Sequence, residues 1–413
     1  MEQLRKKIQE QVIGQLSFAE QASDEEIQEA IDVVILQEGM CQGCTVQEKL
    51  QLKKDVFNSL RRLDVLQELV ENKGITEIMI NGPNGIFIEE NGRIRKWEKV
   101  FESKEKLEDI IQQIVAKANR VVNEANPIVD TRLADGSRVN VVLPPVALNG
   151  PIVTIRKFPE QAMTMEELLA IGSISPEVAA FLEKLVKARM NIFISGGTGS
   201  GKTTFLNILS NYIPKDERII TIEDSAELQI TQIPNLVTLE TRNANVEGKH
   251  AITIRDLIKS ALRMRPDRII VGEVRDAAAI DMLTALNTGH DGSLSTGHAN
   301  SPADMLSRLE TMVLTGGVDM PLAAIRAQIA SAIEIVVHLG RLRDKTRKVM
   351  EIVEVLSMVD GQIVIRPLYK FVEEGEAADG TVIGQLKKTE FALQQRDKLQ
   401  KAGITLEEES NAI

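Results

Sequence analysis

The spacing of apolar side chains changes character along the chain and divides it into segments. In residues 1–72, apolar residues recur every three or four positions among many Lys, Glu and Gln, which predicts helices over Glu25–Leu36 and Val46–Val70. From residue 73 to 157, apolar and polar residues alternate, which indicates short strands, with one helix expected over Lys104–Arg120. The expected strands are Glu77–Ile80, Ile86–Ile88, Arg93–Trp97, Arg138–Leu143 and Ile152–Arg156. Turns are expected at Asn91-Gly92 and Asp135-Gly136. We therefore expect a helical N-terminal extension followed by an α+β module.

A connector at residues 158–175 leads into a region where strands and helices alternate. Thr164 and Glu167 have the spacing of a capping box, and Ser175-Pro176 is a typical helix start. Four apolar strands are expected, with a helix after each of the first three. The strands are Asn191–Ser195, Ile219–Ile222, Arg268–Val271 and Ser293–Thr296, and the helices are Thr203–Ile213, Thr253–Met264 and Ala277–Asn287. Alternation of this kind predicts an α/β domain with a parallel sheet, which we place at residues 176–370.

The end of this domain reads differently. Glu334–Val337 and Lys348–Leu356 are expected to be antiparallel strands at the edge of the sheet. Residues 371–413 are polar and poorly patterned, and we expect a tail there.

Composition narrows the class of protein. The 413 residues carry 60 acidic and 49 basic side chains, a net charge of -11, which argues against a protein that wraps nucleic acid. We find no apolar run near the ~20 residues that span a bilayer and no secretory signal at the start, so we expect a cytosolic protein. Cys41 and Cys44 lie in a connection between helices and are interpreted as incidental thiols.

One motif carries specific chemistry. The segment from Gly196 to Thr203 fits G-x-x-x-x-G-K-[ST], between an expected buried strand and an expected helix. Such a loop turns backbone N–H groups toward phosphates, the lysine contacts the β- and γ-phosphates, and the threonine hydroxyl ligates Mg²⁺. The sequence therefore predicts a nucleoside triphosphate site. The residues assigned to it are Gly196, Gly197, Thr198, Gly199, Ser200, Gly201, Lys202, Thr203 and Thr204.

Acidic residues follow the next two strands, where ligands bind in a parallel sheet. Glu223 ends one strand and Glu273 follows another, and nucleotide hydrolysis needs one carboxylate to polarise water and another near the metal. Asp224 and Glu227 are weaker candidates for the same roles.

Histidines and arginines leave alternatives open. His290 and His298 flank a short strand, and a histidine there could contact a γ-phosphate or be a hydrogen-bonded structural residue. Arginines near the Asp135-Gly136 turn, at a strand end and before the third core strand could stabilise phosphate charge or lie on the surface. These are Arg132, Arg138, Arg156 and Arg263.

The phosphate loop occurs together with three further segments, in one order. They are an acidic box at Ile222–Leu228, a variant Walker B segment at Gly272–Arg275 and a histidine box at Thr288–His298. The combination resembles the bacterial type II/type IV secretion ATPase superfamily. The segments Arg132–Asn140, Thr154–Phe158 and Ala261–Arg268 look most like its CpaF-like branch, which powers Tad/Flp pilus assembly.

The resemblance implies a hexameric ring whose subunits have a PAS-like N-terminal domain and a RecA-like P-loop domain, with ATP and Mg²⁺ held between them. It implies that Glu223 is the catalytic glutamate, that Thr203 and Glu273 belong to the Mg²⁺ and water network, and that His298 acts near the γ-phosphate. It also implies that arginines reach the phosphates from the N-terminal domain and from a neighbouring element; these are Arg132, Arg138, Arg156 and Arg263.

We therefore expect a cytoplasmic ATP-driven motor, peripheral at the inner face of the membrane. Inner-membrane platform proteins of a pilus or secretion machine would be its partners, and no direct nucleic-acid contact is expected. One alternative is another motor of the superfamily, for conjugation or pilus retraction. A P-loop small-molecule phosphotransferase and a nucleotide-sensing scaffold that does not hydrolyse are the others.

Overall fold

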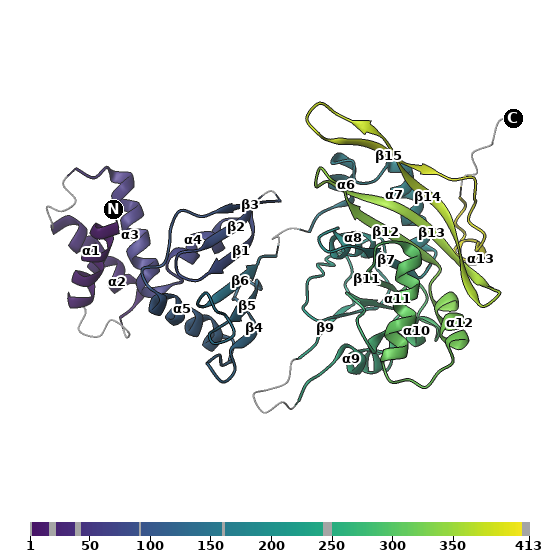
Figure 1. Ribbon diagram of the computed structural model, residues 1–413, viewed down its shortest axis with the longest axis horizontal. Helices are drawn as coiled ribbons and strands as arrows, with labels where there is room; N and C mark the ends of the chain where they lie inside the picture. Colours follow the sequence, from purple (N-terminus) through teal and green to yellow (C-terminus); the bar gives the residue numbers. More distant parts are fainter. Residues whose placement is uncertain are drawn as a thin grey trace. The chain divides into compact units, whose positions relative to one another are not determined.

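The computed structural model describes residues 2–15, 22–37, 43–90, 92–158, 162–242 and 250–406. The chain divides into two compact units, Met1–Glu160 and Gln161–Ile413 (Figure 1). Cys41 and Asn91 lie outside the described residues. No helix in the described part of the chain is long and apolar enough to cross a membrane.

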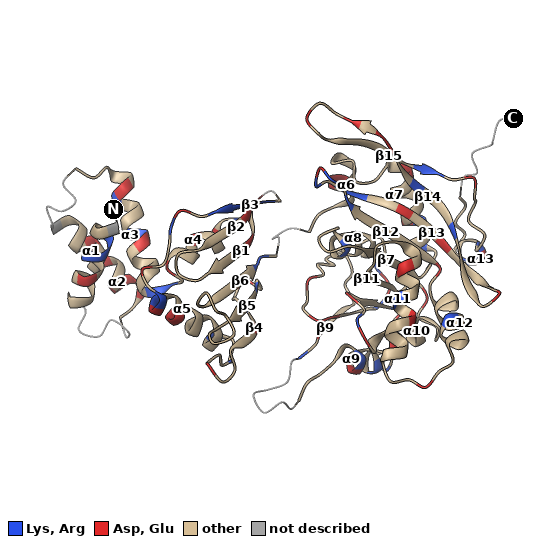
Figure 2. Ribbon diagram, in the orientation of Figure 1, with Lys and Arg blue, Asp and Glu red and all other residues tan. Residues whose placement is uncertain are grey.

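The first unit begins with helices that share one apolar core. Ile8, Ile31 and Val56 come from three different helices and are buried together, as the helical period predicts. Charges of both signs cover the outer faces of these helices (Figure 2). The helices are α1 (Glu2–Gln15), α2 (Asp24–Gln37), α3 (Val46–Arg61) and α4 (Val65–Glu71).

The single helix expected over Val46–Val70 is wrong, because the chain turns between α3 and α4. The Asp64 N–H donates to the Asn58 carbonyl at 3.1 Å, and Asp64 has a positive φ of 51°. Its buried carboxylate accepts a hydrogen bond from Arg5 of α1 at 3.0 Å. This tertiary contact favours the break, and an apolar period cannot reveal it.

The rest of the first unit is an antiparallel sheet covered on one face by a helix. Its strand order is β3-β2-β1-β6-β5-β4. Helix α5 packs Leu107, Ile111 and Ile114 against the apolar face of the sheet. The expected strands are confirmed, and the short edge strand β4 is an addition. The elements are β1 (Ile75–Asn81), β2 (Ile86–Glu90), β3 (Arg93–Lys96), α5 (Lys104–Lys117), β4 (Ile128–Arg132), β5 (Arg138–Val142) and β6 (Ile152–Arg156).

The second unit is a nine-stranded sheet with a parallel core and an antiparallel extension. The strand order is β15-β14-β13-β12-β7-β11-β10-β8-β9, and the strands from β12 to β9 in this order are parallel. The strands are β7 (Ile192–Gly196), β8 (Ile219–Glu223), β9 (Leu236–Glu240), β10 (Arg268–Val271), β11 (Leu294–His298), β12 (Ile335–Arg341), β13 (Arg347–Val359), β14 (Gln362–Glu376) and β15 (Val382–Lys388).

Helices cover both faces of the parallel core (Figure 1). Strand β7 is buried throughout, with Ile192 and Ile194 in the core cluster shared with α7 and α8, and Phe193 in the cluster shared with α9 to α12. Continuous burial of this kind is typical of a parallel strand. The helices are α6 (Met165–Ala170), α7 (Pro176–Lys187), α8 (Lys202–Ser210), α9 (Ile254–Ala261), α10 (Ala278–Leu286), α11 (Pro302–Thr315), α12 (Leu322–Ala332) and α13 (Asp397–Lys401).

Two expectations for the end of the chain are wrong. Strands β12 and β13 pair antiparallel as expected, but neither is at the edge of the sheet. Strand β12 also pairs in parallel with β7, with Leu339 opposite Gly196. Regular elements also continue past residue 371, because β14 runs to Glu376 and pairs with β15, and α13 follows. Past residue 371 these strands carry several charged and exposed residues, so the pattern reads as polar.

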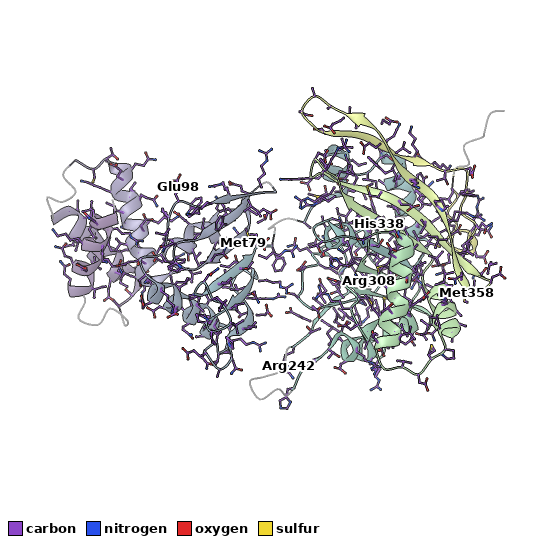
Figure 3. The ribbon with its side chains drawn as sticks, viewed as in Figure 1. Met79, Glu98, Arg242, Arg308, His338 and Met358 are labelled. Carbon is purple, nitrogen blue, oxygen red and sulfur yellow. The ribbon has the colours of Figure 1, made fainter. Side chains whose placement is uncertain are left out.

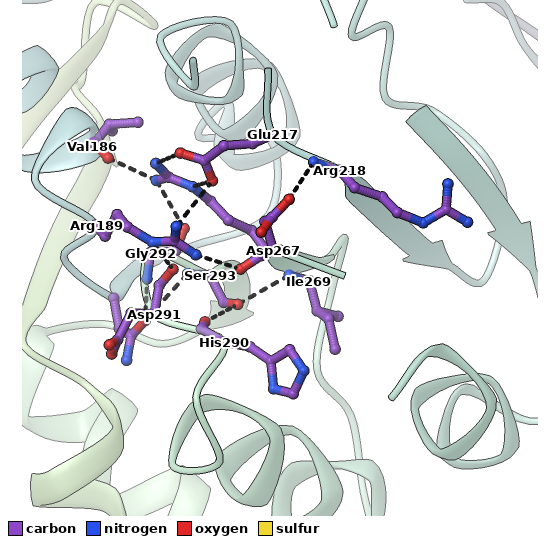
Figure 4. Close-up of polar contacts among 12 residues, drawn as sticks. Val186, Arg189, Glu217, Arg218, Asp267, Ile269, His290, Asp291, Gly292 and Ser293 are labelled. Carbon is purple, nitrogen blue, oxygen red and sulfur yellow. Dashed lines mark hydrogen bonds and ion pairs between the residues drawn. The ribbon is translucent and has the colours of Figure 1, made fainter. Parts of the chain in front are cut away.

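A buried ion pair holds the starts of the core strands, at the edge away from the phosphate loop (Figure 4). The Arg268 guanidinium is fully buried, and it donates two hydrogen bonds of 2.7 Å to the Glu217 carboxylate. It also donates to the Val186 carbonyl at 2.6 Å. Arg189 donates to the carbonyls of Asp267 and Asp291. The network joins the end of α7 to the starts of β8, β10 and β11.

Candidate nucleotide-binding site

The phosphate loop connects the buried end of β7 to the first turn of α8. Gly199 and Gly201 have positive φ angles of 71° and 94°, so glycine is needed at both positions. Gly201 is the N-cap of α8 and offers no side chain to cap the helix. The N–H groups at the start of a helix can point toward an anion. All predicted residues from Gly196 to Thr204 lie in this strand end, loop and turn.

The lysine of the loop points into a buried polar cluster. The Lys202 ammonium donates to the Gly197 carbonyl at 2.9 Å and to Nδ1 of His298 at 3.2 Å. Because an ammonium only donates, Nδ1 of His298 accepts and its Nε2 carries the proton. That Nε2 lies 3.2 Å from Oε1 of Glu273. Burial, and then the Lys202 charge, lower the pKa of His298, which favours the neutral ring.

Glu273 continues the cluster toward the acidic box. Its carboxylate accepts two hydrogen bonds from the Arg275 guanidinium, at 2.9 and 2.8 Å, and Arg275 lies 3.6 Å from Asp224. Burial raises the pKa of Glu273, but the Arg275 hydrogen bonds and charge outweigh it, so the pKa lies below its usual value. Glu273 is therefore ionised at neutral pH. The structure brings the Walker B segment, the histidine box and the phosphate loop together, as predicted.

Glu223 occupies a different environment at the end of β8. Its side chain is buried and accepts hydrogen bonds from the N–H groups of Glu227 and Leu228, at 2.9 and 3.1 Å. Burial raises its pKa to about 7 despite these bonds. Gly272 makes room for it, since a Cβ there would lie 2.8 Å from Cγ of Glu223. A carboxylate with this pKa can accept a proton near neutral pH.

Two predicted residues lie away from the loop. His290 precedes β11, where its Nδ1 donates to the Ala285 carbonyl at 3.1 Å and its own carbonyl accepts from Ser293 (Figure 4). Of the two alternatives for His290, the structural one holds. Arg263 is exposed and follows α9; the neighbouring Met264 carbonyl accepts from Arg218, which precedes β8. Arg263 therefore lies near the ends of the strands where they begin, and the phosphate loop lies where they finish. Arg263 does not reach the loop of its own chain.

Arg132, Arg138 and Arg156 belong to the first unit, and the structure brings these three predicted arginines together. Arg132 is the cross-strand partner of Arg138, and Arg138 is the partner of Arg156. They form a row across β4, β5 and β6. Their neighbours Val139 and Ile155 are buried on the α5 side of the sheet, so the row lies on the other face.

His338 was missed by the sequence analysis. It lies on β12 (Figure 3). It is opposite Ser195, the residue before the phosphate loop, with its Nδ1 at 2.8 Å from the Ser195 hydroxyl. Burial lowers its pKa. Nothing in the local sequence marks this position, because its importance comes from the pairing of β12 with β7. Arg341 and Arg347, at the β12–β13 turn, were missed for the same reason.

The oxygen ligands at the site suit Mg²⁺. The Thr203 hydroxyl is in the first turn of α8, and the ionised Glu273 carboxylate lies next to the same lysine and histidine. Among the described residues, no group of three His, Cys, Asp or Glu side chains could hold a metal alone. Mg²⁺ commonly takes one or two protein oxygens together with phosphates and water, which this set can provide.

Comparison with known proteins gives one family. A family model described as type II/IV secretion system protein matches residues 59–398. A candidate conjugal transfer protein of Mycobacterium tuberculosis is 37% identical over 72% of this chain and 86% of its own length. The conjugal transfer protein TrbB of Rhizobium radiobacter is 32% identical over 71% of this chain and 87% of its own length. The type IV secretion system protein VirB11 of Bartonella quintana is 31% identical over 71% and 92%.

Solved structures agree with the fold. The pilus retraction motor PilT, solved with ADP, has a TM-score of 0.50 at 18% identity, over 83% of this chain and 87% of its own. The ATPase DotB of Yersinia pseudotuberculosis has a TM-score of 0.51 at 18% identity, over 71% and 78%. At this identity the likeness concerns the fold alone, and it confirms the predicted α/β class with a RecA-like core.

Proposed function

The chain belongs to the type II/IV secretion system protein family, and we propose that it is a motor that hydrolyses ATP to power pilus assembly or protein secretion. One observation carries the proposal: the buried Lys202 of the phosphate loop is joined through His298 to Glu273. A glycine-rich turn that binds nothing has no need of a buried lysine beside an ionised carboxylate, because burying such charges costs free energy.

The residues divide the work of hydrolysis among them. The loop N–H groups and the start of α8 bind the phosphates, and Lys202 exchanges its bonds to Gly197 and His298 for the β- and γ-phosphates. Thr203 and Glu273 would hold Mg²⁺, which would neutralise charge on the phosphate oxygens. His298, freed at Nδ1, faces the γ-phosphate with a neutral ring, which adds no charge of its own to the site.

Glu223 is the general base in this proposal. Its pKa of about 7 lets it take a proton from the attacking water without being protonated most of the time. In the structure its carboxylate bonds to the Glu227 and Leu228 N–H groups, which are close along the chain and fix its orientation.

Arginines complete the site from elsewhere. We assign Arg138 and Arg156, with Arg132, to the phosphates of the same nucleotide, because a row of three guanidinium groups on one sheet face suits a polyanion. Since Arg263 lies at the opposite edge from its own phosphate loop, we assign it to the site of a neighbouring subunit in a homohexameric ring. Inner-membrane platform proteins would hold the ring at the cytoplasmic face of the membrane.

The Tad/Flp branch is our first choice of machine, on the segments Arg132–Asn140, Thr154–Phe158 and Ala261–Arg268. Conjugation is the second, because two of the relatives above carry conjugal transfer names. A deletion strain scored for surface pili and for plasmid transfer separates the two machines. Loss of pili alone supports the first, and loss of transfer alone supports the second.

Hydrolysis is tested with Glu223→Gln, which keeps the shape of the side chain but removes the base. Wild-type protein should hydrolyse ATP, and the variant should bind a fluorescent ATP analogue normally while losing turnover by at least about 10²-fold. Glu183→Gln, a change at a partly exposed glutamate of α7 that pairs with Lys187, is the control and should behave as wild type. Binding without turnover in the wild type would favour a nucleotide-sensing scaffold. Transfer of phosphate to a small molecule would favour the phosphotransferase.

A further inference from the structure

Arg347, the first residue of β13, contacts the phosphate loop directly. Its Nε donates to the Gly199 carbonyl at 2.8 Å, and its Cδ lies 3.5 Å from where a Cβ on Gly201 would be. The carbonyl of Gly199 and the N–H of Ser200 belong to one planar peptide. A donor fixed to that oxygen therefore helps to fix the direction of the Ser200 N–H. This N–H donates to the Gly197 carbonyl at 3.4 Å in the structure, and it is one of the loop amides that a phosphate would meet.

The backbone of the same residue contacts the segment after α6, which belongs to the second unit. The Ser173 hydroxyl donates to the Arg347 carbonyl at 2.7 Å, and the Val349 N–H donates to the Ser173 carbonyl at 3.1 Å. Lys348 adds a bond from its ammonium to the Gly172 carbonyl at 2.6 Å. These contacts attach the segment after α6 to the start of β13. Arg347 thus touches the connector with its backbone and the phosphate loop with its side chain.

The positive charges of Arg341 and Arg347 favour an anion bound at the phosphate loop. Arg341 is the cross-strand partner of Arg347, and its guanidinium lies 3.9 Å from a Cβ built on Gly199. Like charges directly opposite each other on neighbouring strands are destabilising. Neither guanidinium has an ion-pair partner among the residues that the structure describes. An anion on the phosphate loop would relieve the repulsion and favour this position of the β12–β13 turn.

We propose that Arg347 is a positioning residue that couples the phosphate loop to the connector. The inference rests on the proposed nucleotide site and adds a route by which its occupancy reaches the part of the connector after α6. Coupling is reciprocal, so nucleotide stabilises the connector contact to the same extent that the contact raises nucleotide affinity.

The test measures the affinity of the full-length protein for MANT-ADP with Mg²⁺. Arg347→Ala should weaken binding about fivefold, the value of one hydrogen bond from a charged donor at an exposed site. Its KM for ATP should rise by a similar factor with kcat nearly unchanged, and Arg347→Lys should recover part of the loss. The matched control is Arg343→Ala, an equally exposed arginine of the same turn that pairs with Glu373 and Glu376.

Coupling to the connector needs a second variant. Ser173→Ala removes the bond to the Arg347 carbonyl and leaves the loop untouched, yet it should weaken MANT-ADP binding about twofold. With Arg347→Ala in the same chain, it should add nothing further. Hydrogen exchange gives the reverse direction: ADP should slow exchange at the Val349 amide in the wild type and in Arg343→Ala, but not in Arg347→Ala.

Two results would overturn the inference. One is Arg347→Ala binding MANT-ADP as tightly as Arg343→Ala does. The other is additive effects of Ser173→Ala and Arg347→Ala, with Val349 exchange unchanged by ADP. Both results presuppose a wild-type protein that binds the nucleotide. A wild type that binds none would instead contradict the proposed function itself.

Discussion

Glu223 and Glu273 show how one site gives two carboxylates different tasks. Both follow adjacent strands, but Glu273 is paired with Arg275 while Glu223 is buried against backbone N–H groups. Glu273 therefore stays ionised and suits a metal, whereas Glu223 titrates near neutral pH and suits a proton acceptor. Sequence can indicate two acids after two strands, but only the neighbours decide which does what.

The raised pKa of Glu223 predicts how turnover depends on pH. Its protonated form cannot accept a proton from water, so kcat should fall as pH falls through about 7 and level off above it. The measurement is the rate of ATP hydrolysis at saturating ATP from about pH 5.5 to about pH 9, a range that extends to both sides of this pKa. A profile that is flat across pH 7 would contradict the assignment of Glu223 as base.

The same shift affects stability with a definite sign. Because the folded protein holds this proton up to about pH 7 and the unfolded chain releases it near 4.5, stability falls as pH rises between these values. The Gln side chain of Glu223→Gln carries no titrating proton. The difference in free energy of unfolding between variant and wild type should therefore shift in favour of the variant from pH 4 to pH 8, by at most about 3 kcal/mol.

Individual residues were predictable where a local motif marks them. The nine residues of the phosphate loop, Glu223, Glu273 and His298 all follow from motif and strand end, and the structure brings Lys202, His298 and Glu273 within hydrogen-bond distance of one another. His338 and Arg347 reach the loop only because β12 pairs with β7. A single sequence contains no signal for the order of strands in a sheet, so these two could not be found.

At the scale of elements, strands and helices with a regular spacing of apolar residues could be predicted, and those with a weak pattern could not. The core strands and the helices after them lie within a few residues of their predicted bounds. Strands β14 and β15 in the extension were missed because charges at their exposed positions hide the apolar pattern. The edge strand β9 was also missed, although it carries only one charge. The break at Asp64 was missed because a contact with α1 favours it.

The buried pair of Arg268 and Glu217 makes a prediction at this scale, since it joins α7, β8, β10 and β11. Arg268→Met would leave Glu217 buried without its partner and should cost about 3–5 kcal/mol of the stability of the second unit. Adding Glu217→Gln should recover part of this loss. Urea unfolding followed by far-UV circular dichroism measures the stability of the single and the double variant.

The exposed Arg263 supplies the control for that experiment. Arg263→Met removes a guanidinium only a few residues away but breaks no buried pair, so its unfolding midpoint should match that of wild type. Equal destabilisation by the two single variants would show that the network does not stabilise the strand starts.

At the scale of the whole molecule, the family resemblance is confirmed, and the Tad/Flp branch stays a prediction. Residues 59–398 match the family model, which spans parts of both units. The helices before residue 59 lie outside it. Their own apolar core, built on Ile8, Ile31 and Val56, shows that they fold together.

The row of arginines in the first unit makes the prediction that depends most on both units. If Arg138 and Arg156 contact the nucleotide, then Arg138→Ala and Arg156→Ala should each lower ATP turnover by about 10²-fold or more, with a smaller effect on affinity. Arg93→Ala, on the edge strand β3 of the same sheet, is the control and should leave turnover unchanged. Normal turnover in both row variants would exclude the first unit from the reaction.

The central claim is that a glycine-rich loop and its buried lysine bind ATP for hydrolysis, and Lys202→Ala tests it most directly. Isothermal titration and a phosphate-release assay should show loss of both ATP affinity and turnover, while Lys215→Ala, a change at an exposed lysine after α8, keeps both. A Lys202→Ala protein that binds and hydrolyses ATP like wild type would contradict the account.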